Sequence, residues 1–308
     1  MDDAMDETVD ETVDDAVDGT GAFSLRQAIG RFGVFGGISD AERSVRNEAA
    51  AELEELGFGA FWLGHSTAGE AAPVLAATGS ITVATAIQSI WRSGAEDTAA
   101  RFAELEAAHP GRFVLGLGVS HPQMVRGYRS PLASMAGYLD GLDAAERPVP
   151  AGRRVLAALG PRMLGLARDR SAGALPYLVT ADQVASVRRA LGAGPVLAPE
   201  LGVVLEADPG RARALAREAL SFYLGLTNYT ANWLRGGFTE EDLADGGSDR
   251  LVDALFAWGG EERVRARVEE FRAAGADHVA LQLIGSPAPG GLPREGWRRL
   301  AEVVGAGQ

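Results

Sequence analysis

The stretch VLAALGPRMLGLA, Val155 to Ala167, is the short segment from which the fold can be argued. Its apolar first part is typical of a buried strand, its Gly-Pro pair of a turn, and its remainder of the first turns of a helix. A strand that leads directly into a helix is the building unit of an α/β protein.

The same unit recurs along almost the whole chain. Several of the strand-like runs are apolar on both faces, as parallel strands covered by helices must be. Eight such runs with helices between them predict a TIM-like (β/α)8 barrel, with a doubly wound open sheet as the alternative. The expected strands lie at 32–35, 58–63, 81–87, 113–117, 154–159, 174–179, 201–205 and 278–284.

The segment between the seventh and eighth expected strands, 206–277, is too long for a single crossover. Its pattern predicts a helical insertion there. The expected helices lie at 209–224, around 239–244, at 249–257 and at 261–274.

Local signals mark where helices begin and end. The spacing of a hydroxyl residue and a Glu or Gln three positions later predicts capping boxes at Ser39–Glu42, Ser93–Glu96 and Thr180–Gln183. Asp208 followed by Pro209 predicts another helix start. Glycines predict helix ends at Gly57, Gly192 and Gly275.

The acidic charge is concentrated at one end of the chain. The 308 residues carry a formal net charge of −13, and residues 1–18 hold nine acids and no base. This composition predicts an acidic disordered tail over residues 1–27 and a single barrel domain over 28–308. The tail lacks the basic start and the apolar core of a targeting peptide, so we expect a cytoplasmic protein.

Two residue types are missing, and their absence narrows the chemistry. The chain has no cysteine, which excludes thiolate catalysis and zinc–thiolate sites. All 29 of its basic residues are arginine, which excludes a lysine Schiff base and a P-loop lysine. The acidic balance argues against nucleic-acid binding. The uncharged run 71–87 is broken by Pro73 and Gly79, which argues against a membrane span.

The four histidines separate by their position in the expected barrel, where function belongs to the carboxyl ends of strands. His109 and His278 precede strands and are expected to be structural. His65 and His121 follow strands, and they are the candidate proton-transfer residues. No metal-binding motif accompanies them, so no metal site is predicted.

Two glycine-containing segments suggest where a cofactor could approach. Gly118, at the end of an expected strand, would let a flat ring come close to the backbone. LGPRM, Leu159 to Met163, offers free N–H groups at a helix start together with Arg162, which favours an anion. The alternative for LGPRM is an ordinary helix start.

The chain resembles the luciferase-like superfamily of flavin and deazaflavin enzymes. Within that superfamily it resembles the coenzyme F420-dependent oxidoreductases, and in particular an actinobacterial-type subgroup whose substrate is unassigned. The resemblance covers the chain from about Ile29 to Ile284, and its motifs stand in the family's order. They read GRFGVF, AELEELGFGAFWL, RFVLGLGVSHP, LAALGPRMLGLA, AGALPYLVT, SDRLVDALFAWG and AGADHVALQL.

The resemblance implies a cofactor ring over the barrel mouth and a non-proline cis peptide at Ala86–Ile87 behind it. It places the cofactor phosphate on Leu159, Gly160 and Arg162, beside the segment from Gly173 to Thr180. Gly118 and Ser120 complete the expected cofactor-binding residues.

One branch of the family has an Asp-His pair after the second strand and a glutamate after the fourth. Here these places read Gly64-His65 and Ser120-His121, which argues against that branch's sugar-phosphate substrate.

Three functions follow as hypotheses. The first is an oxidoreductase that moves a hydride between coenzyme F420 and a small organic substrate. The second is an FMN-dependent monooxygenase, and the third is a non-catalytic flavin-binding barrel. The resemblance also implies a homodimer. The aromatic residues of the expected insertion either shape the substrate pocket or serve packing, and they are Tyr223, Tyr229, Trp233 and Phe238.

Overall fold

The computed structural model describes residues 23–37, 43–285 and 292–307, and all strands in these ranges belong to one parallel sheet. Going round the sheet, the strands follow one another as β10, β9, β11, β1, β2, β3, β5, β6, β7 and β8, and β4 pairs with β5. Their bounds are β1 Phe32–Gly37, β2 Ala60–Gly64, β3 Thr82–Ala86, β4 Gln88–Ser89, β5 Phe113–Gly118, β6 Arg154–Leu156, β7 Gly173–Ala174, β8 Val196–Leu197, β9 Glu200–Val204, β10 Phe256–Trp258 and β11 Val279–Leu283.

The sheet curls because the continuous segment that contains β8 and β9 pairs with β7 on one side and with β11 on the other. β8 pairs with β7, β9 pairs with β11, and only Ala198 and Pro199 separate β8 from β9. The backbone N–H of Ala198 donates to Ala174 on one side, and the N–H of Ala280 donates to Pro199 on the other. The strand order has no reversal of the kind a doubly wound sheet shows. The curled all-parallel sheet is consistent with the predicted TIM-like barrel.

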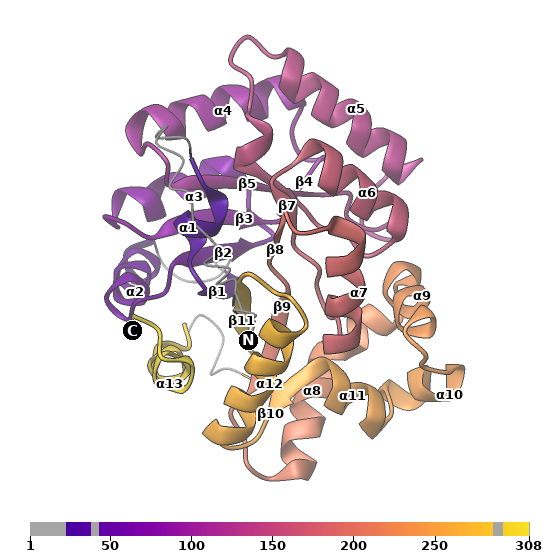
Figure 1. The fold of residues 1–308 in the computed structure, drawn as a ribbon. Helices are drawn as coiled ribbons and strands as arrows, with labels where there is room; N and C mark the ends of the chain where they lie inside the picture. Colours follow the sequence, from indigo (N-terminus) through magenta and orange to yellow (C-terminus); the bar gives the residue numbers. More distant parts are fainter. Residues whose placement is uncertain (1–22, 38–42, 286–291, 308) are drawn as a thin grey trace, which may run out of the picture.

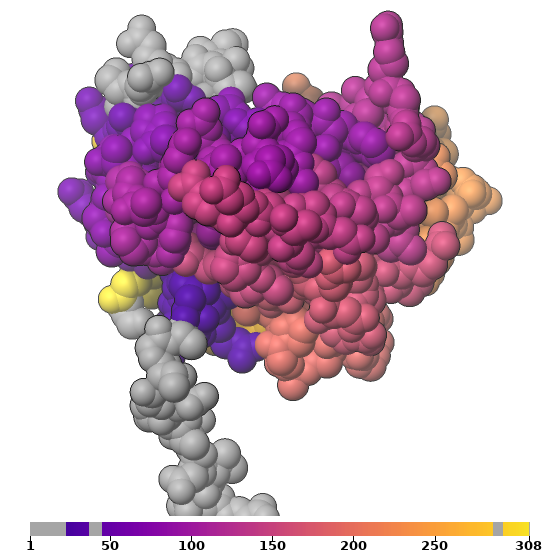
Figure 2. Space-filling view, turned by 90° about the horizontal axis from the view of Figure 1, so that it is seen from above, coloured from indigo at the N-terminus to yellow at the C-terminus, as the bar shows by residue number. Residues whose placement is uncertain are grey.

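Helices cover the outside of the sheet (Figure 1). They are α2 Arg43–Glu55, α3 Ala68–Ala76, α4 Ala95–Ala108, α5 Pro131–Ala144, α6 Pro161–Arg170, α7 Ala181–Leu191, α12 Glu261–Ala273 and α13 Arg294–Val304. In the space-filling view, atoms of the first half of the chain, indigo to magenta, form most of one face, and orange atoms from the segment after β9 lie at its edge (Figure 2).

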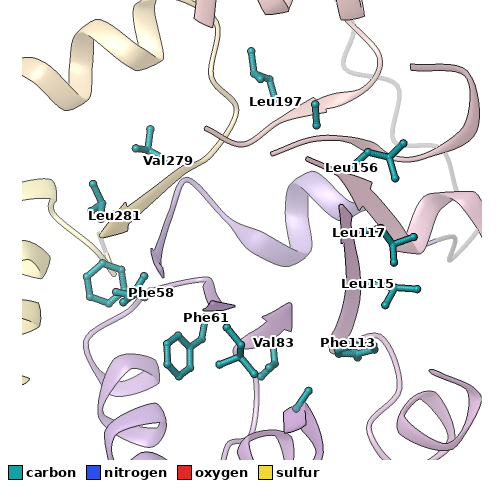
Figure 3. Close-up of a cluster of buried hydrophobic side chains, with 14 of the residues drawn as sticks. Phe58, Phe61, Val83, Phe113, Leu115, Leu117, Leu156, Leu197, Val279 and Leu281 are labelled. Carbon is teal, nitrogen blue, oxygen red and sulfur yellow. The ribbon is translucent and has the colours of Figure 1, made fainter. Parts of the chain in front are cut away.

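The main core lies between the strands and these helices. Figure 3 shows ten of its labelled side chains arranged around the outside of the strands, among them Phe61, Phe113 and Leu281. Burying apolar surface is the main stabilising contribution to such a layered fold. This outer layer therefore holds the sheet in its curled form.

A second, smaller cluster fills the inside of the sheet. It contains the inward residues of several strands, such as Trp62 and Val114, together with Leu25 and Ile29 of the short helix α1, Leu25–Ile29. The acidic tail predicted over 1–27 is therefore too long. Residues 23–27 belong to the folded part because Leu25 is buried, and residues 1–22 lie outside the described residues.

The segment between β9 and β11 contains the expected helices and two elements that were not expected. The predicted helices correspond to α8 Pro209–Leu224, α10 Glu240–Leu243, α11 Asp249–Leu255 and α12. α9, Thr227–Arg235, was missed, and the helix expected over 249–257 ends at Leu255 because β10 follows and pairs with β9. The segment is thus mainly helical but adds one strand to the sheet.

The predicted strand lengths were less accurate than their positions. Only the beginnings of the runs at 154–159 and 174–179 are extended, and short β4 and β8 were missed. No helix among the described residues has the length and apolar character that crossing a membrane would require.

The capping predictions separate into three outcomes. The capping box at Thr180–Gln183 and the helix start at Asp208–Pro209 are confirmed. The Thr180 side chain accepts a hydrogen bond from Gln183 N, and the Asp208 side chain accepts one from Arg211 N. The box at Ser93–Glu96 is wrong, because Gly94 is the N-cap and α4 begins one residue later than the motif implies. The box at Ser39–Glu42 lies outside the described residues.

Candidate active site

His65 lies at the carboxyl end of β2, where the barrel rule places functional residues. Its backbone is left-handed, with φ +54°, and its side chain is exposed. Its N–H donates to Ala86 O of β3 at 3.3 Å, and its carbonyl accepts from an Arg92 guanidinium N–H at 2.7 Å. Both backbone contacts fix the turn and leave the imidazole without a described partner.

His121 follows β5 and is half-buried against α9. Its Nδ1 lies 3.2 Å from Asn228 Oδ1, and its ring centre is 5.6 Å from that of Tyr229. Burial lowers the pKa of His121, against the opposing effect of the Asn228 hydrogen bond, and the charge of His65 lowers it further. Because the amide oxygen can only accept, Nδ1 carries the proton and Nε2 keeps its lone pair.

The predicted catalytic pair lies at the same end of the sheet, because His65 follows β2 and His121 follows β5, with β3 between these two strands. The two residues are 56 positions apart in the sequence, yet the sheet brings them close enough to interact. An imidazole at each of these two strand ends can hold a proton near neutral pH. The remaining histidines serve the fold: His278 is buried at the start of β11, and His109 is the C-cap of α4.

The Ala86–Ile87 peptide bond is cis, which confirms that prediction. Ile87 packs against Gly118 at the end of β5: a Cβ on Gly118 would lie 2.7 Å from the Ile87 side chain. The missing side chain of Gly118 therefore makes room for Ile87. Contact between Gly118 and a ring stays a prediction.

Ser120 continues the same strand end in a left-handed conformation, with φ +56°. The carbonyl of its neighbour Val119 accepts from Trp91 Nε1 at 2.6 Å. This contact anchors the loop that carries Ser120 and His121 to the segment after β4.

The LGPRM turn forms the N-terminus of α6, as expected. Gly160 is the N-cap without a side-chain cap, and Pro161 occupies the first helical position. A Cβ on Gly160 would meet no atom within 4 Å, and Arg162 is exposed. The uncapped helix start with open space and a nearby guanidinium fits an anionic group such as a phosphate.

Two other predicted cofactor residues already have roles in the fold. A Cβ on Gly173 would lie 1.9 Å from Val196 O, so this glycine permits the close approach of β7 and β8. Thr180 is buried and caps α7. Their expected contact with a cofactor stays a prediction.

Sequence reasoning missed a group of polar residues beside the barrel mouth. Tyr177 donates from its hydroxyl to Gln282 Oε1 at 2.9 Å, and it receives a hydrogen bond from the Tyr223 hydroxyl at 3.3 Å. Glu200, at the start of β9, is buried and accepts from Leu178 N at 3.2 Å. The available signal was the single acid inside the apolar run VLAPELGVVL.

The aromatic residues of the 206–277 segment divide between the two uses that were expected. Tyr223 and Tyr229 meet Tyr177 at ring-centre distances of 5.3 and 6.2 Å, so they line the mouth. Trp233 is buried and donates from Nε1 to Leu178 O at 2.9 Å, and Phe238 packs under Arg250. These two support the packing of α9 and α10.

Two hollows lie near the strand ends. One of about 360 Å³ is bordered by the ends of β9 and β11 and the start of α13. One of about 220 Å³ lies between the starts of α6 and α7 and the end of α9, next to Leu159 and Pro161. In the part of the chain that the structure describes, no three potential metal ligands come together.

Comparison with known protein families gives a match over part of the chain. Residues 36–145, which include both candidate histidines, match the family model described as luciferase-like monooxygenase. No curated protein matches the sequence.

Solved structures share the fold at low sequence identity. An F420-dependent secondary alcohol dehydrogenase in complex with an F420–acetone adduct gives a TM-score of 0.68 at 16% identity, covering 90% of this chain and 99% of that one. The coenzyme F420-dependent tetrahydromethanopterin reductase from Methanopyrus kandleri gives 0.66 at 15%, covering 89% and 98%. The oxygenating constituent of 3,6-diketocamphane monooxygenase from Pseudomonas putida, in complex with FMN, gives 0.64 at 12%, covering 89% and 98%. Neighbours of both cofactor types thus share this fold.

Proposed function

We propose that the protein is a luciferase-like oxidoreductase that binds a flavin-type cofactor over the carboxyl ends of its strands. The observation that carries the proposal is the position of His65 and His121 after the carboxyl ends of β2 and β5, in the part of the chain that matches the luciferase-like family model. Such a pair can hold a proton beside a redox-active ring, which the chain's own residues do not supply.

The finer proposal is that the cofactor is coenzyme F420 and that the substrate is a small organic molecule. It is supported by the order of the sequence motifs and by structural neighbours that use F420. When bound, the cofactor would supply a ring carbon that accepts or donates a hydride.

The chain's own residues would then have separate tasks. The start of α6, with Gly160 and Arg162, would hold the cofactor's phosphate beside Leu159, because it offers an uncapped helix terminus and open space. His121, neutral at pH 7 because burial lowers its pKa, would accept a proton at Nε2, and His65 would be its exposed partner.

An FMN-dependent monooxygenase is the second candidate. It is favoured by the monooxygenase description of the matching family model and by the neighbour that contains FMN. The non-catalytic flavin-binding barrel is motivated by Gly64 and Ser120, which stand where one branch of the family has acidic residues.

A binding titration with coenzyme F420 and FMN in parallel, each followed by its own fluorescence, tests the proposal. We expect F420 to bind and Arg162→Ala to weaken its binding by roughly tenfold, since a charge-assisted contact to phosphate is lost. Arg168→Ala is the matched control, because Arg168 lies at the other end of α6 and pairs with Asp169. His65→Ala should leave binding in place and lower turnover.

Each alternative has its own outcome. Preferential binding of FMN would replace the first proposal by the monooxygenase. Binding of either cofactor without reduction or reoxidation by any substrate would favour the non-catalytic barrel. Failure of both to bind would contradict the proposal. The homodimer is a separate prediction, tested by sedimentation of the purified protein.

A further inference from the structure

Glu200 is a buried acid that the proposed function does not yet use. It is the first residue of β9 and pairs in register with Ala280 of β11. Ala280 belongs to the cluster that fills the inside of the sheet, and because paired residues of parallel strands face the same side, Glu200 also points inward. Its exposed fraction is 2%.

The carboxyl group has one hydrogen bond and one free oxygen. Its Oε2 accepts from Leu178 N at 3.2 Å, while its buried Oε1 has no partner among the described residues. Leu178 has a left-handed backbone, with φ +51°, and its carbonyl is held by Trp233. Glu200 thereby helps to fix the turn that presents Tyr177.

The surroundings contain hydroxyl groups rather than positive charges. The charge of Glu200 raises the pKa of three tyrosines, which are Tyr177 after β7, Tyr223 of α8 and Tyr229 of α9. From β11, the neutral amide of Gln282 contacts Tyr177. Among the residues that the structure describes, no arginine, histidine or second carboxylate contributes to the pKa of Glu200. Burial raises the pKa of Glu200 to about 8, against the opposing effect of the Leu178 N–H.

Burying a carboxylate without a cation costs far more free energy than burying the neutral acid. Burial likewise raises the pKa of Tyr177 and of Tyr229 well above their ordinary values. The whole group beside the mouth is therefore uncharged near neutral pH, and it can face an electron-rich ring without repelling it.

We propose that Glu200 is a positioning residue of the mouth that enters ligand binding as a neutral carboxylic acid, so that binding of an anionic or carbonyl-bearing ring is linked to one proton on Glu200. The identity of the ligand rests on the proposed function, whereas the protonation of Glu200 does not.

The sign of the linkage follows from desolvation. A ring over the mouth removes remaining water and adds electron density, and both effects favour the neutral form of Glu200. Its pKa is then higher in the complex than in the free protein. Affinity is unaffected by pH below the pKa of the free protein, and above it affinity falls by about tenfold per pH unit until the pKa of the complex is reached.

The experiment measures the affinity for coenzyme F420 and for FMN from about pH 6 to about pH 10 in the wild type, Glu200→Gln and Glu206→Gln. Ionisation of the probe is common to all three proteins and cancels in the comparison. We expect Glu200→Gln to lose the extra fall in affinity above pH 8. Glu206→Gln should keep it, because Glu206 lies beyond the end of β9, pairs with Arg211 and has a lowered pKa, so it stays ionised throughout.

A second measurement needs neither ligand nor variant. Infrared difference spectra of the protein labelled with ¹³C-glutamate should show one protonated carboxyl that titrates near pH 8. A carboxyl already ionised at about pH 6 would overturn the proposal. The same pH dependence of affinity in the wild type and Glu200→Gln would overturn it while leaving the proposed function intact. If neither probe binds at any pH, the proposed function and the linkage fail together, and the infrared titration still decides the state of Glu200.

Discussion

Two buried polar residues inside the sheet, His278 and Glu200, differ in how completely their side chains are hydrogen-bonded. At the amino end, Trp62 Nε1 donates to His278 Nε2 at 2.8 Å, and His278 Nδ1 lies 2.9 Å from Gly30 O. Burial lowers the pKa of His278 to about 4, so it stays neutral and completes this chain of hydrogen bonds. Beside the mouth, by contrast, Glu200 keeps an oxygen without a partner among the described residues. A buried polar atom without a partner calls for an explanation, and a ligand bound at the mouth would supply one.

The raised pKa of Glu200 predicts a stability effect that is independent of any ligand. The folded value of about 8 exceeds the ordinary 4.5, so the stabilisation is full below pH 4.5 and is lost as the pH rises to 8. Glu200→Gln cannot ionise, and its stability relative to the wild type should increase by about 1.4 kcal/mol per pH unit between these limits. Urea unfolding at pH 5 and pH 8 measures it, and an equal difference at both would contradict the prediction.

Two glycines with different surroundings, Gly116 in β5 and Gly165 in α6, should respond oppositely to substitution by alanine. A Cβ on Gly116 of β5 would lie 1.9 Å from Thr85 O, so Gly116→Ala should destabilise the fold by about 3 kcal/mol or more. Gly165, inside α6, has open space around its Cβ position, and Gly165→Ala should stabilise by about 0.5–1 kcal/mol. Thermal unfolding distinguishes the two, and similar shifts would show that the close contact yields easily.

At the scale of elements, helix starts depend on which residue takes the N-cap position. Thr180 and Ser93 stand in similar motifs, but only Thr180 is an N-cap with its side chain bonded to the helix. α4 begins after Gly94 instead and has no side-chain cap. A shift of one residue thus separates a real capping box from a sequence match.

This difference gives a matched pair of variants. Thr180→Ala removes the acceptor of the Gln183 N–H, and we expect it to lower the free energy of unfolding by about 1 kcal/mol. Ser93→Ala should change it by less than about 0.5 kcal/mol. Chemical denaturation provides both values, and an equally large loss for Ser93→Ala would mean that it also caps α4.

At the scale of the whole molecule, the N-terminal segment closes the amino end of the sheet. Leu25 and Ile29 are buried among inward residues of the strands, and Phe23 lies 4.1 Å from the Arg153 guanidinium. The Ala28 carbonyl accepts from Thr82 Oγ1 at 2.8 Å. α1 is therefore part of the barrel's core.

Two truncations test this role. Removal of residues 1–29 should cost about 3 kcal/mol or more, because two buried apolar side chains and their cover of the sheet interior are lost. Removal of residues 1–22 should leave stability unchanged, as expected from the acidic composition of that segment. Equal melting temperatures of both truncated proteins would contradict the structural role of α1.

The sequence by itself determined the class of fold and the order of its elements. Apolar runs, turn residues and helix caps act over a few neighbouring residues, so they can be interpreted locally, and they located the main strands, the LGPRM turn and α8. The barrel rule then placed His65 and His121 at one end of the sheet, because parallel strands share the direction of their carboxyl ends.

Only the tertiary structure decided which side chains meet. Tyr177, Glu200 and Gln282 come from three strands or strand ends far apart in the chain, and their contact depends on register and on the curl of the sheet. Residues 25–27, the first part of α1, were assigned to the acidic tail because burial of Leu25 requires an interior that exists only when the strands have assembled. Local pattern cannot specify such contacts, since a shift of one residue in a strand would turn each side chain to the opposite face.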